Sequence, residues 1–141
     1  MFGKVVIVGA GLIGGSFALG LKRAHAAACI VGLERSAQAL ARAQELGIID
    51  VASTDPQDAL RGADLVLLAA PVAQTGAILA QLAPWLEPHT IVTDAGSTKA
   101  DVVASARAAL GEVIRQFVPG HPIAGRESNG PDAALPDLFR V

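Results

Sequence analysis

A short apolar run that ends in three spaced glycines constrains this chain more than any other feature. Residues 5–8 are Val-Val-Ile-Val, which is typical of a parallel strand buried on both faces. Gly9, Gly11 and Gly14 follow with the spacing G-x-G-x-x-G, and a helical pattern begins at once. We expect Gly9 to make a tight turn, Gly11 to let a diphosphate approach the backbone, and Gly14 to let the helix pack closely on the sheet.

An acidic residue completes this pattern. Glu34 directly follows the next apolar run, residues 29–33, and lies about twenty residues after Gly14, where a carboxylate can accept hydrogen bonds from an adenosine ribose. The N–H groups of Leu12 and Ile13 open the intervening helix and can hold a diphosphate. Strand, glycines, helix, second strand and terminal acid together predict a dinucleotide site.

Composition places the chain in a narrow class. Its 141 residues are enough for one domain, and 52% hydrophobic against 17% charged residues suits a sheet covered on both faces. A net charge of −2 gives no reason to expect nucleic acid or a membrane surface as partner. Cys29 is the only cysteine, so we expect no internal disulfide and an inert core thiol. No leader or membrane span is predicted, which favours a soluble cytoplasmic protein.

Strand and helix patterns alternate along the chain. Further strands are predicted at 29–34, 48–53, 64–70, 90–94 and 116–119, and helices at 12–26, 36–46, shortly after 55, 72–82 and 98–110. This order predicts an α/β fold with a doubly wound, mostly parallel sheet, a Rossmann-type dinucleotide-binding domain that spans residues 1–141. Residues 138–141 are typical of a strand that begins, so we expect the chain to be the N-terminal part of a longer enzyme.

Two segments follow predicted strands at the edge where such sheets bind ligands. Ala70 and Pro71 are small enough to let a cofactor pass, although a simple turn explains them equally well. Ser97 or Thr98 is a good N-cap for the next helix, but capping does not explain Lys99, since a positive charge is unfavourable at a helix N-terminus. The predicted cofactor-binding residues are Gly9, Gly11, Leu12, Ile13, Gly14, Glu34, Arg35, Ala70 and Pro71.

A third segment after the last predicted strand contains a histidine. His121 lies between Gly120 and Pro122, which restrict its backbone. Imidazole can accept a proton near neutral pH, so His121 is a candidate general base. His25, near a helix end, and His89, in a loop, are interpreted as structural or exposed.

Three motifs together carry a family resemblance. They are VGAGLIGGS at 8–16, TDAGSTK at 93–99 and GHPIAGRE at 120–127. Over essentially its whole length the chain resembles the N-terminal nucleotide-binding domain of the prephenate/arogenate (cyclohexadienyl) dehydrogenase family. The resemblance implies oxidative decarboxylation of prephenate or arogenate in tyrosine biosynthesis, with NAD⁺ or NADP⁺ as hydride acceptor. It also implies a helical C-terminal domain, absent here, that makes a homodimer.

The resemblance assigns roles to individual residues. His121 matches the catalytic histidine that accepts the proton of the ring hydroxyl, and Ser97 matches a serine that hydrogen-bonds the same hydroxyl. Lys99 and Glu127 match positions near the substrate, and no metal ligand is implied. Glu34 favours NAD⁺ because a carboxylate repels a 2′-phosphate, while Arg35 leaves NADP⁺ open.

Two other functions fit part of this pattern. A β-hydroxyacid or 6-phosphogluconate type dehydrogenase shares the glycine fingerprint, but it does not explain the Gly-His-Pro segment. A non-catalytic, NAD-sensing Rossmann module needs only the glycines and the acid.

Overall fold

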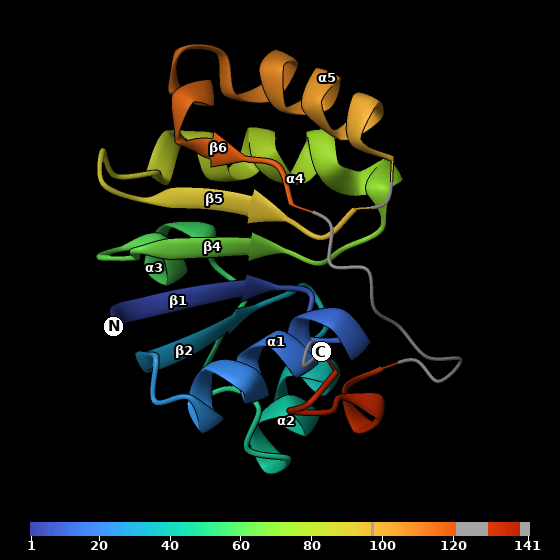
Figure 1. Ribbon diagram of the computed structural model, residues 1–141. Helices are drawn as coiled ribbons and strands as arrows, with labels where there is room; N and C mark the ends of the chain where they lie inside the picture. The colour runs from blue at the N-terminus through green and yellow to red at the C-terminus, as the bar shows by residue number, and fades with distance from the viewer. Residues whose placement is uncertain (97, 121–129, 139–141) are drawn as a thin grey trace.

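A computed structural model describes residues 1–96, 98–120 and 130–138. Among these residues, six strands form one sheet in the order β3-β2-β1-β4-β5-β6, and every neighbouring pair is parallel (Figure 1). The strands are β1 (Phe2–Val8), β2 (Ala27–Leu33), β3 (Val51–Ser53), β4 (Leu65–Leu68), β5 (Ile91–Asp94) and β6 (Phe117–Val118). The predicted doubly wound α/β fold is confirmed.

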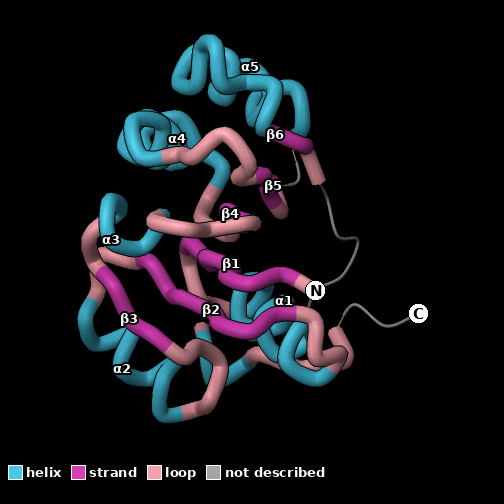
Figure 2. Tube along the Cα trace, turned by 90° about the vertical axis from the view of Figure 1, so that its left-hand side faces the viewer, coloured by secondary structure: helices cyan, strands magenta, loops and turns pink. Residues whose placement is uncertain are grey.

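Helices cover both faces of the sheet, as Figure 2 shows. The α-helices are α1 (Leu12–Arg23), α2 (Ala37–Glu45), α3 (Pro56–Leu60), α4 (Thr75–Leu82) and α5 (Lys99–Leu110). Short 3₁₀ turns are η1 (Val72–Gln74), η2 (Ala83–Trp85), η3 (Gly111–Gln116) and η4 (Pro131–Ala133). Helices α1 and α2 lie on one face, and α3, α4 and α5 lie on the other.

Alternate side chains of each central strand enter two separate cores. In β1, Val5 and Ile7 pack on the side of α1 and α2, whereas Val6 packs on the side of α4 and α5. All three are fully buried. Strands buried on both faces are continuous apolar runs, which is why the alternation typical of a half-exposed strand is missing from the sequence.

Two helices begin with a side-chain cap. The Ser36 hydroxyl accepts a hydrogen bond from the Ala39 N–H at 3.1 Å, and the Asp55 carboxylate accepts one from Gln57 at 3.1 Å, with Pro56 at the first helical position. Each cap satisfies a backbone N–H that the helix itself leaves without an acceptor.

Several predicted boundaries differ from the structure: β2 begins at Ala27 rather than at 29, and β4 ends at Leu68 rather than at 70. Two further differences have identifiable reasons. Helix α1 ends at Arg23 rather than at 26, because His25 adopts a positive φ of 52° and the Ala26 N–H turns back to the Leu21 carbonyl at 2.9 Å. Strand β3 begins at Val51 rather than at 48, since the preceding isoleucines are buried in the core instead of pairing in the sheet.

The last described segment returns to the first half of the sheet. Turn η4 lies against α1 and α2, where the Asp132 carboxylate accepts a hydrogen bond from Arg42 Nη2 at 2.6 Å. The Ser16 hydroxyl accepts one from the Leu135 N–H at 2.8 Å, and Arg23 pairs with Asp137. Leu138 lies in a turn rather than in a strand, and the rest of the predicted strand lies outside the described residues.

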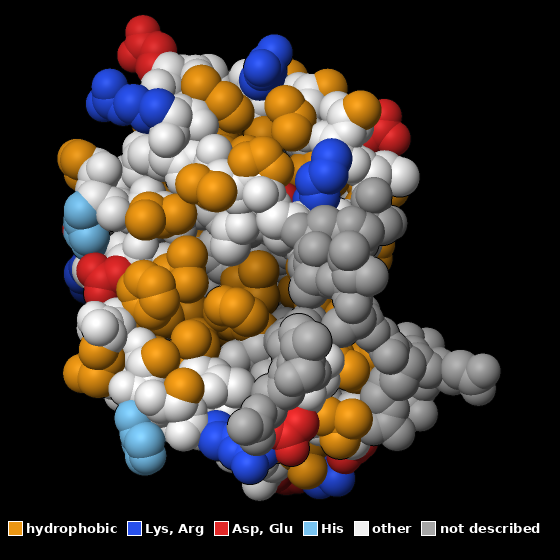
Figure 3. Space-filling view, in the orientation of Figure 1, with side chains coloured by type: hydrophobic (Ala, Val, Ile, Leu, Met, Phe, Trp, Pro, Cys, Tyr) orange, Lys and Arg blue, Asp and Glu red, His pale blue; other side chains and the backbone are white. Residues whose placement is uncertain are grey.

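Apolar side chains remain at the surface on the α1 side of the sheet. Figure 3 shows hydrophobic atoms gathered over β1, β4 and β5. Ile91 is 44% exposed and Val118 is 54% exposed. Within the described residues, no helix combines the length and the apolar character needed to cross a bilayer.

Two glycine replacements in α1 test how closely this helix is packed. A Cβ on Gly14 would lie 2.1 Å from the Gly9 carbonyl oxygen, so Gly14→Ala should cost about 3 kcal/mol or more in unfolding free energy. Gly20 is the control, because a Cβ there would lie 3.6 Å from Pro136 O, an ordinary van der Waals distance. Gly20→Ala should stabilise the protein by about 0.5–1 kcal/mol through helix propensity. Urea unfolding measures both, and equal effects would contradict the described packing.

Candidate functional site

The three fingerprint glycines have different surroundings in the β1–α1 turn. Gly9 has a positive φ of 90°, and a Cβ there would lie 3.0 Å from the Ala69 carbonyl oxygen. Gly14 has no room for a side chain, because a Cβ there would lie 2.1 Å from the Gly9 carbonyl oxygen. A Cβ on Gly11 would meet nothing within 4 Å. The turn is therefore closed toward the protein at Gly9 and Gly14 and open at Gly11.

This opening lies where the order of the sheet reverses. Strand β1 pairs with β2 on one side and with β4 on the other. Strand β3 lies beyond β2, and β5 and β6 lie beyond β4. The Ala69 N–H donates to the Val8 carbonyl at 2.8 Å, which holds the segment after β4 beside the turn after β1. Ala70 and Pro71 follow in that segment. Open α/β sheets bind ligands at such a switch point.

The amino end of α1 points at this opening. Gly11 occupies the N-cap position and offers no side chain to the first turn, which contains no acidic residue. The first N–H groups of the helix, from Leu12 and Ile13, therefore remain available to an anion, which the helix dipole also favours.

Glu34 lies at the end of β2 on the same edge of the sheet. Its N–H donates to the Ser53 carbonyl at 3.3 Å, which fixes the backbone where the strand ends. The side chain is partly buried, and this burial raises the pKa of the Glu34 carboxyl above its ordinary value. Arg35, the next residue, is exposed.

A buried carboxylate organises the other half of this edge. Asp94, the last residue of β5, is only 3% exposed. One of its oxygens accepts a hydrogen bond from the Gly96 N–H at 2.9 Å and forms an ion pair with Lys99. The second oxygen accepts one from the Gly120 N–H at 3.0 Å. Three segments of the chain therefore meet at Asp94.

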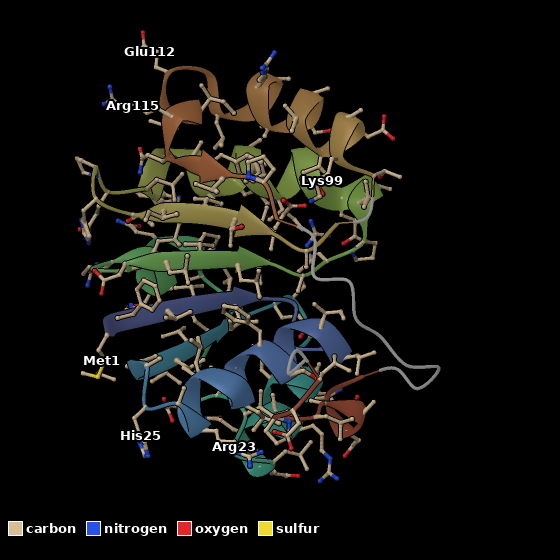
Figure 4. The ribbon with its side chains drawn as sticks, viewed as in Figure 1. Met1, Arg23, His25, Lys99, Glu112 and Arg115 are labelled. Carbon is tan, nitrogen blue, oxygen red and sulfur yellow. The ribbon has the colours of Figure 1, made fainter. Side chains whose placement is uncertain are left out.

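This arrangement explains the position of Lys99 and corrects one capping prediction. Lys99 begins α5, and Figure 4 shows it at the carboxyl edge of the sheet. Its ammonium neutralises the buried Asp94, which outweighs the unfavourable placement at a helix N-terminus. Thr98 occupies the N-cap position, but its side chain makes no capping hydrogen bond.

Three predicted site residues are not placed. Ser97, His121 and Glu127 lie outside the described residues. Sequence analysis missed Asp94 as an organising residue, although a carboxylate that ends a buried strand is itself a signal, since a buried charge needs partners. Among the residues that the structure describes, no cluster of His, Cys, Asp or Glu is arranged to hold a metal ion.

The other two histidines lie away from this edge. Figure 4 shows His25 beyond the end of α1, on the side of the molecule where the strands begin. His89 lies in the loop before β5, and its Nε2 is 3.3 Å from a carboxylate oxygen of Asp64. Neither histidine belongs to the candidate site.

Comparison with known families decides the identity of the domain. The family described as "Prephenate dehydrogenase, nucleotide-binding domain" matches residues 17–141 of the chain. The chain belongs to the prephenate dehydrogenase family. This confirms the resemblance found in the sequence.

Individual relatives agree with this family. The cyclohexadienyl dehydrogenase of Zymomonas mobilis is 39% identical over 140 residues, which cover 99% of this chain and 47% of that protein. The structure of prephenate dehydrogenase from Aquifex aeolicus in complex with hydroxyphenyl propionate and NAD⁺ superposes with a TM-score of 0.88 at 36% identity, over 99% of this chain and 48% of that one. Arogenate dehydrogenase from Synechocystis gives a TM-score of 0.85 at 33% identity, over 96% of this chain and 46% of that one.

These prephenate dehydrogenase relatives are longer than the chain. The chain spans about half the length of the Zymomonas enzyme and of the Aquifex structure. A diketoreductase with 20% identity and a TM-score of 0.68 shares the fold alone.

Proposed function

We propose that this chain is the NAD⁺-binding part of an enzyme that oxidises and decarboxylates prephenate or arogenate. The observation that carries the proposal is the opening at Gly11, which faces the switch point of the sheet and lies beside the amino end of α1. Family membership supports the substrate class. Activity on the ring requires a substrate site, and we propose that further chain, of the length seen in the relatives, completes it.

The described residues fit NAD⁺. A Cβ on Gly11 would meet nothing within 4 Å, so this space could accommodate a diphosphate, to which the N–H groups of Leu12 and Ile13 would donate hydrogen bonds. The Glu34 carboxylate would accept hydrogen bonds from the adenosine ribose. Ala70 and Pro71, which follow β4, would lie beside the bound cofactor. The NAD⁺ complex of the Aquifex relative supports this choice of cofactor.

The chemistry follows from the substrate class. When bound, NAD⁺ would supply the hydride acceptor for oxidation of the ring carbon that bears the hydroxyl. We propose that His121 accepts the hydroxyl proton and that Ser97 hydrogen-bonds the same oxygen, since a more anionic oxygen expels hydride more readily. Loss of CO₂ then makes the ring aromatic. Lys99 and Glu127 are proposed near the substrate, and the homodimer and cytoplasmic location remain predictions.

The chain alone should separate binding from turnover. We expect the 141-residue chain to bind NAD⁺ but to turn over prephenate poorly or not at all. Calorimetry and a dehydrogenase assay test the two halves. Absence of NAD⁺ binding at millimolar ligand would refute the proposed cofactor site, and full activity would refute the need for further chain. A chain that binds NAD⁺ and remains inactive within a longer protein would favour an NAD-sensing module.

Replacement of Gly11 tests the diphosphate site. Gly11→Ala places a methyl group in open space, so thermal stability should not fall, while the affinity for NAD⁺ should drop by more than about tenfold because the methyl group collides with the ligand. Calorimetry with NAD⁺ and a thermal melt measure the two effects. Unchanged NAD⁺ affinity in a folded Gly11→Ala variant would move the cofactor away from this turn.

Glu34 should make NAD⁺ binding sensitive to acid. Its pKa is raised, so lowering the pH protonates the carboxyl sooner than usual, and NAD⁺ affinity should weaken as the pH falls through that pKa. Glu34→Gln should bind NAD⁺ about tenfold more weakly, flatten this dependence and narrow the preference for NAD⁺ over NADP⁺. The measurement is calorimetric titration with each cofactor across pH.

The same substitution has an internal control. Because burial disfavours the charged form of Glu34, Glu34→Gln should not lower the melting temperature at neutral pH. A wild-type preference for NADP⁺ would contradict the assigned role of Glu34 and would favour binding of the 2′-phosphate by Arg35.

His121 is tested in the longer protein that we propose carries this chain. His121→Asn should keep the NAD⁺ affinity and lower kcat by about a hundred- to ten-thousand-fold, because Asn can hydrogen-bond the ring hydroxyl but cannot take its proton. The wild-type rate should fall as the pH drops through the histidine's pKa, and the variant should lose that dependence. Near-normal kcat in the variant would return His121 to a structural role.

A further inference from the structure

Asp94 is a buried charge whose hydrogen-bonding capacity is directed at two loops. Its side chain is 3% exposed, and it accepts hydrogen bonds from the N–H groups of Gly96 and Gly120 while it pairs with the ammonium of Lys99. Gly96 lies in the loop after β5 and Lys99 begins α5, whereas Gly120 follows β6. The hydrogen bond from Gly120 to Asp94 therefore connects two residues that are 26 positions apart in the sequence.

Packing around this carboxylate leaves little freedom. A Cβ on Gly120 would lie 2.8 Å from the Asp94 carbonyl oxygen and 3.0 Å from Thr93 Oγ1. A Cβ on Gly96 would lie 3.0 Å from Asp94 Oδ2 and 3.0 Å from Val102 Cγ2. Both glycines thus lie directly against the end of β5, at distances that no larger residue fits without displacement.

A third contact fixes the end of β6. The Thr93 hydroxyl donates to the Val118 carbonyl at 2.6 Å, two residues before Gly120. The segment that leaves β6 is therefore attached to β5 at two successive points, by the side chains of Thr93 and Asp94.

The chain places a proposed reactive residue directly after each glycine. Ser97 follows Gly96, and His121 follows Gly120. We propose that Asp94, with Lys99 as its counter-ion, is a positioning residue that fixes the separation of Gly96 and Gly120, the residues directly before Ser97 and His121. This inference rests on the proposed function, and it assigns Asp94 no direct contact with substrate or cofactor.

The inference also assigns a different task to Lys99. Its side chain is 31% exposed, and its ammonium is engaged by Asp94. Because its charge is compensated by Asp94, this ammonium attracts the carboxylate of a substrate less strongly than an unpaired lysine would. Lys99 therefore acts through Asp94 rather than by direct substrate binding.

Asp94→Asn tests the positioning role in the longer protein. Asn has nearly the same shape as Asp, but its amide nitrogen cannot accept a hydrogen bond from a backbone N–H or from Lys99. We expect kcat with prephenate to fall by about a hundredfold through misplacement of the reactive groups, with the Kd for NAD⁺ unchanged within about twofold. Equal losses in kcat and in NAD⁺ affinity would indicate general damage to the fold and overturn the proposal.

Asp50→Asn is the matched control. Asp50 also accepts a hydrogen bond from a backbone N–H, that of Ile30 at 2.8 Å, and pairs with a lysine, Lys22, at 2.8 Å. It lies before β3, outside the candidate site. Asp50→Asn should leave kcat unchanged. A comparable loss of kcat in this control would show that the effect of Asp94→Asn is not specific to the two loops.

A double-mutant cycle tests the role of Lys99. Lys99→Met should lower kcat by about tenfold with the KM for prephenate unchanged within about twofold, and Asp94→Asn/Lys99→Met should be no worse than Asp94→Asn. A raised KM with unchanged kcat, or additive effects, would return Lys99 to substrate binding and overturn its assignment. If Asp94→Asn does not fold, Lys99→Met alone carries the kinetic test, since it keeps the hydrogen bonds to Gly96 and Gly120.

NMR separates this inference from the proposed function. In the 141-residue chain, the amide resonances of Gly96 and Gly120 should both shift in Asp94→Asn and should stay in place in Asp50→Asn. Unshifted Gly96 and Gly120 amides would overturn the inference whatever the activity. Failure of the wild-type longer protein to oxidise prephenate, with both amides shifted, would overturn the proposed function and leave the link between the loops intact.

Discussion

The close approach of Gly14 to the Gly9 carbonyl determines where helix α1 begins relative to the sheet. A Cβ at Gly14 would lie 2.1 Å from that oxygen, so any larger residue would push the helix away from β1. Because the helix is held close, its uncapped amino end lies at the switch point between β1 and β4. The proposed cofactor site follows from this packing, since backbone N–H groups and open space at Gly11 can bind a diphosphate only where the helix places them.

The two halves of the carboxyl edge are built by different physical means. Around β1 and β2, backbone geometry and one partly buried acid, Glu34, form the proposed cofactor site. Around β5 and β6, the buried Asp94 connects two loops through hydrogen bonds and an ion pair. A buried charge with all its partners in place favours a single arrangement, because each lost partner leaves a desolvated group without compensation. Such an arrangement suits the positioning role that we propose for Asp94.

Local chemistry predicted much of the fold. The glycine fingerprint and the apolar runs are short-range signals, and the structure contains the strands and helices that they indicate. The end of α1 was missed because His25 occupies a left-handed position usually given to glycine, so the sequence carries no stop signal there.

The candidate site was less predictable because its contacts are not local. Asp94 and Gly120 meet only after β5 and β6 pair, and no periodicity in the sequence relates them. Lys99 looked unexplained beside a helix N-terminus until its partner Asp94 was placed. Thr98 has the right residue type for a cap, yet the structure gives it no capping hydrogen bond, since residue type indicates capability and not geometry.

An NMR titration of the 141-residue chain with NAD⁺ tests the central claim most directly, because it locates the ligand without requiring turnover. The account predicts that the amide resonances of Gly11, Leu12 and Ile13 move most, together with those of Glu34 and Ala70. In Gly11→Ala, these shifts should need an NAD⁺ concentration more than about tenfold higher, while the rest of the spectrum is retained. Shifts confined to other elements, or shifts that saturate at the same NAD⁺ concentration in Gly11→Ala, would contradict it.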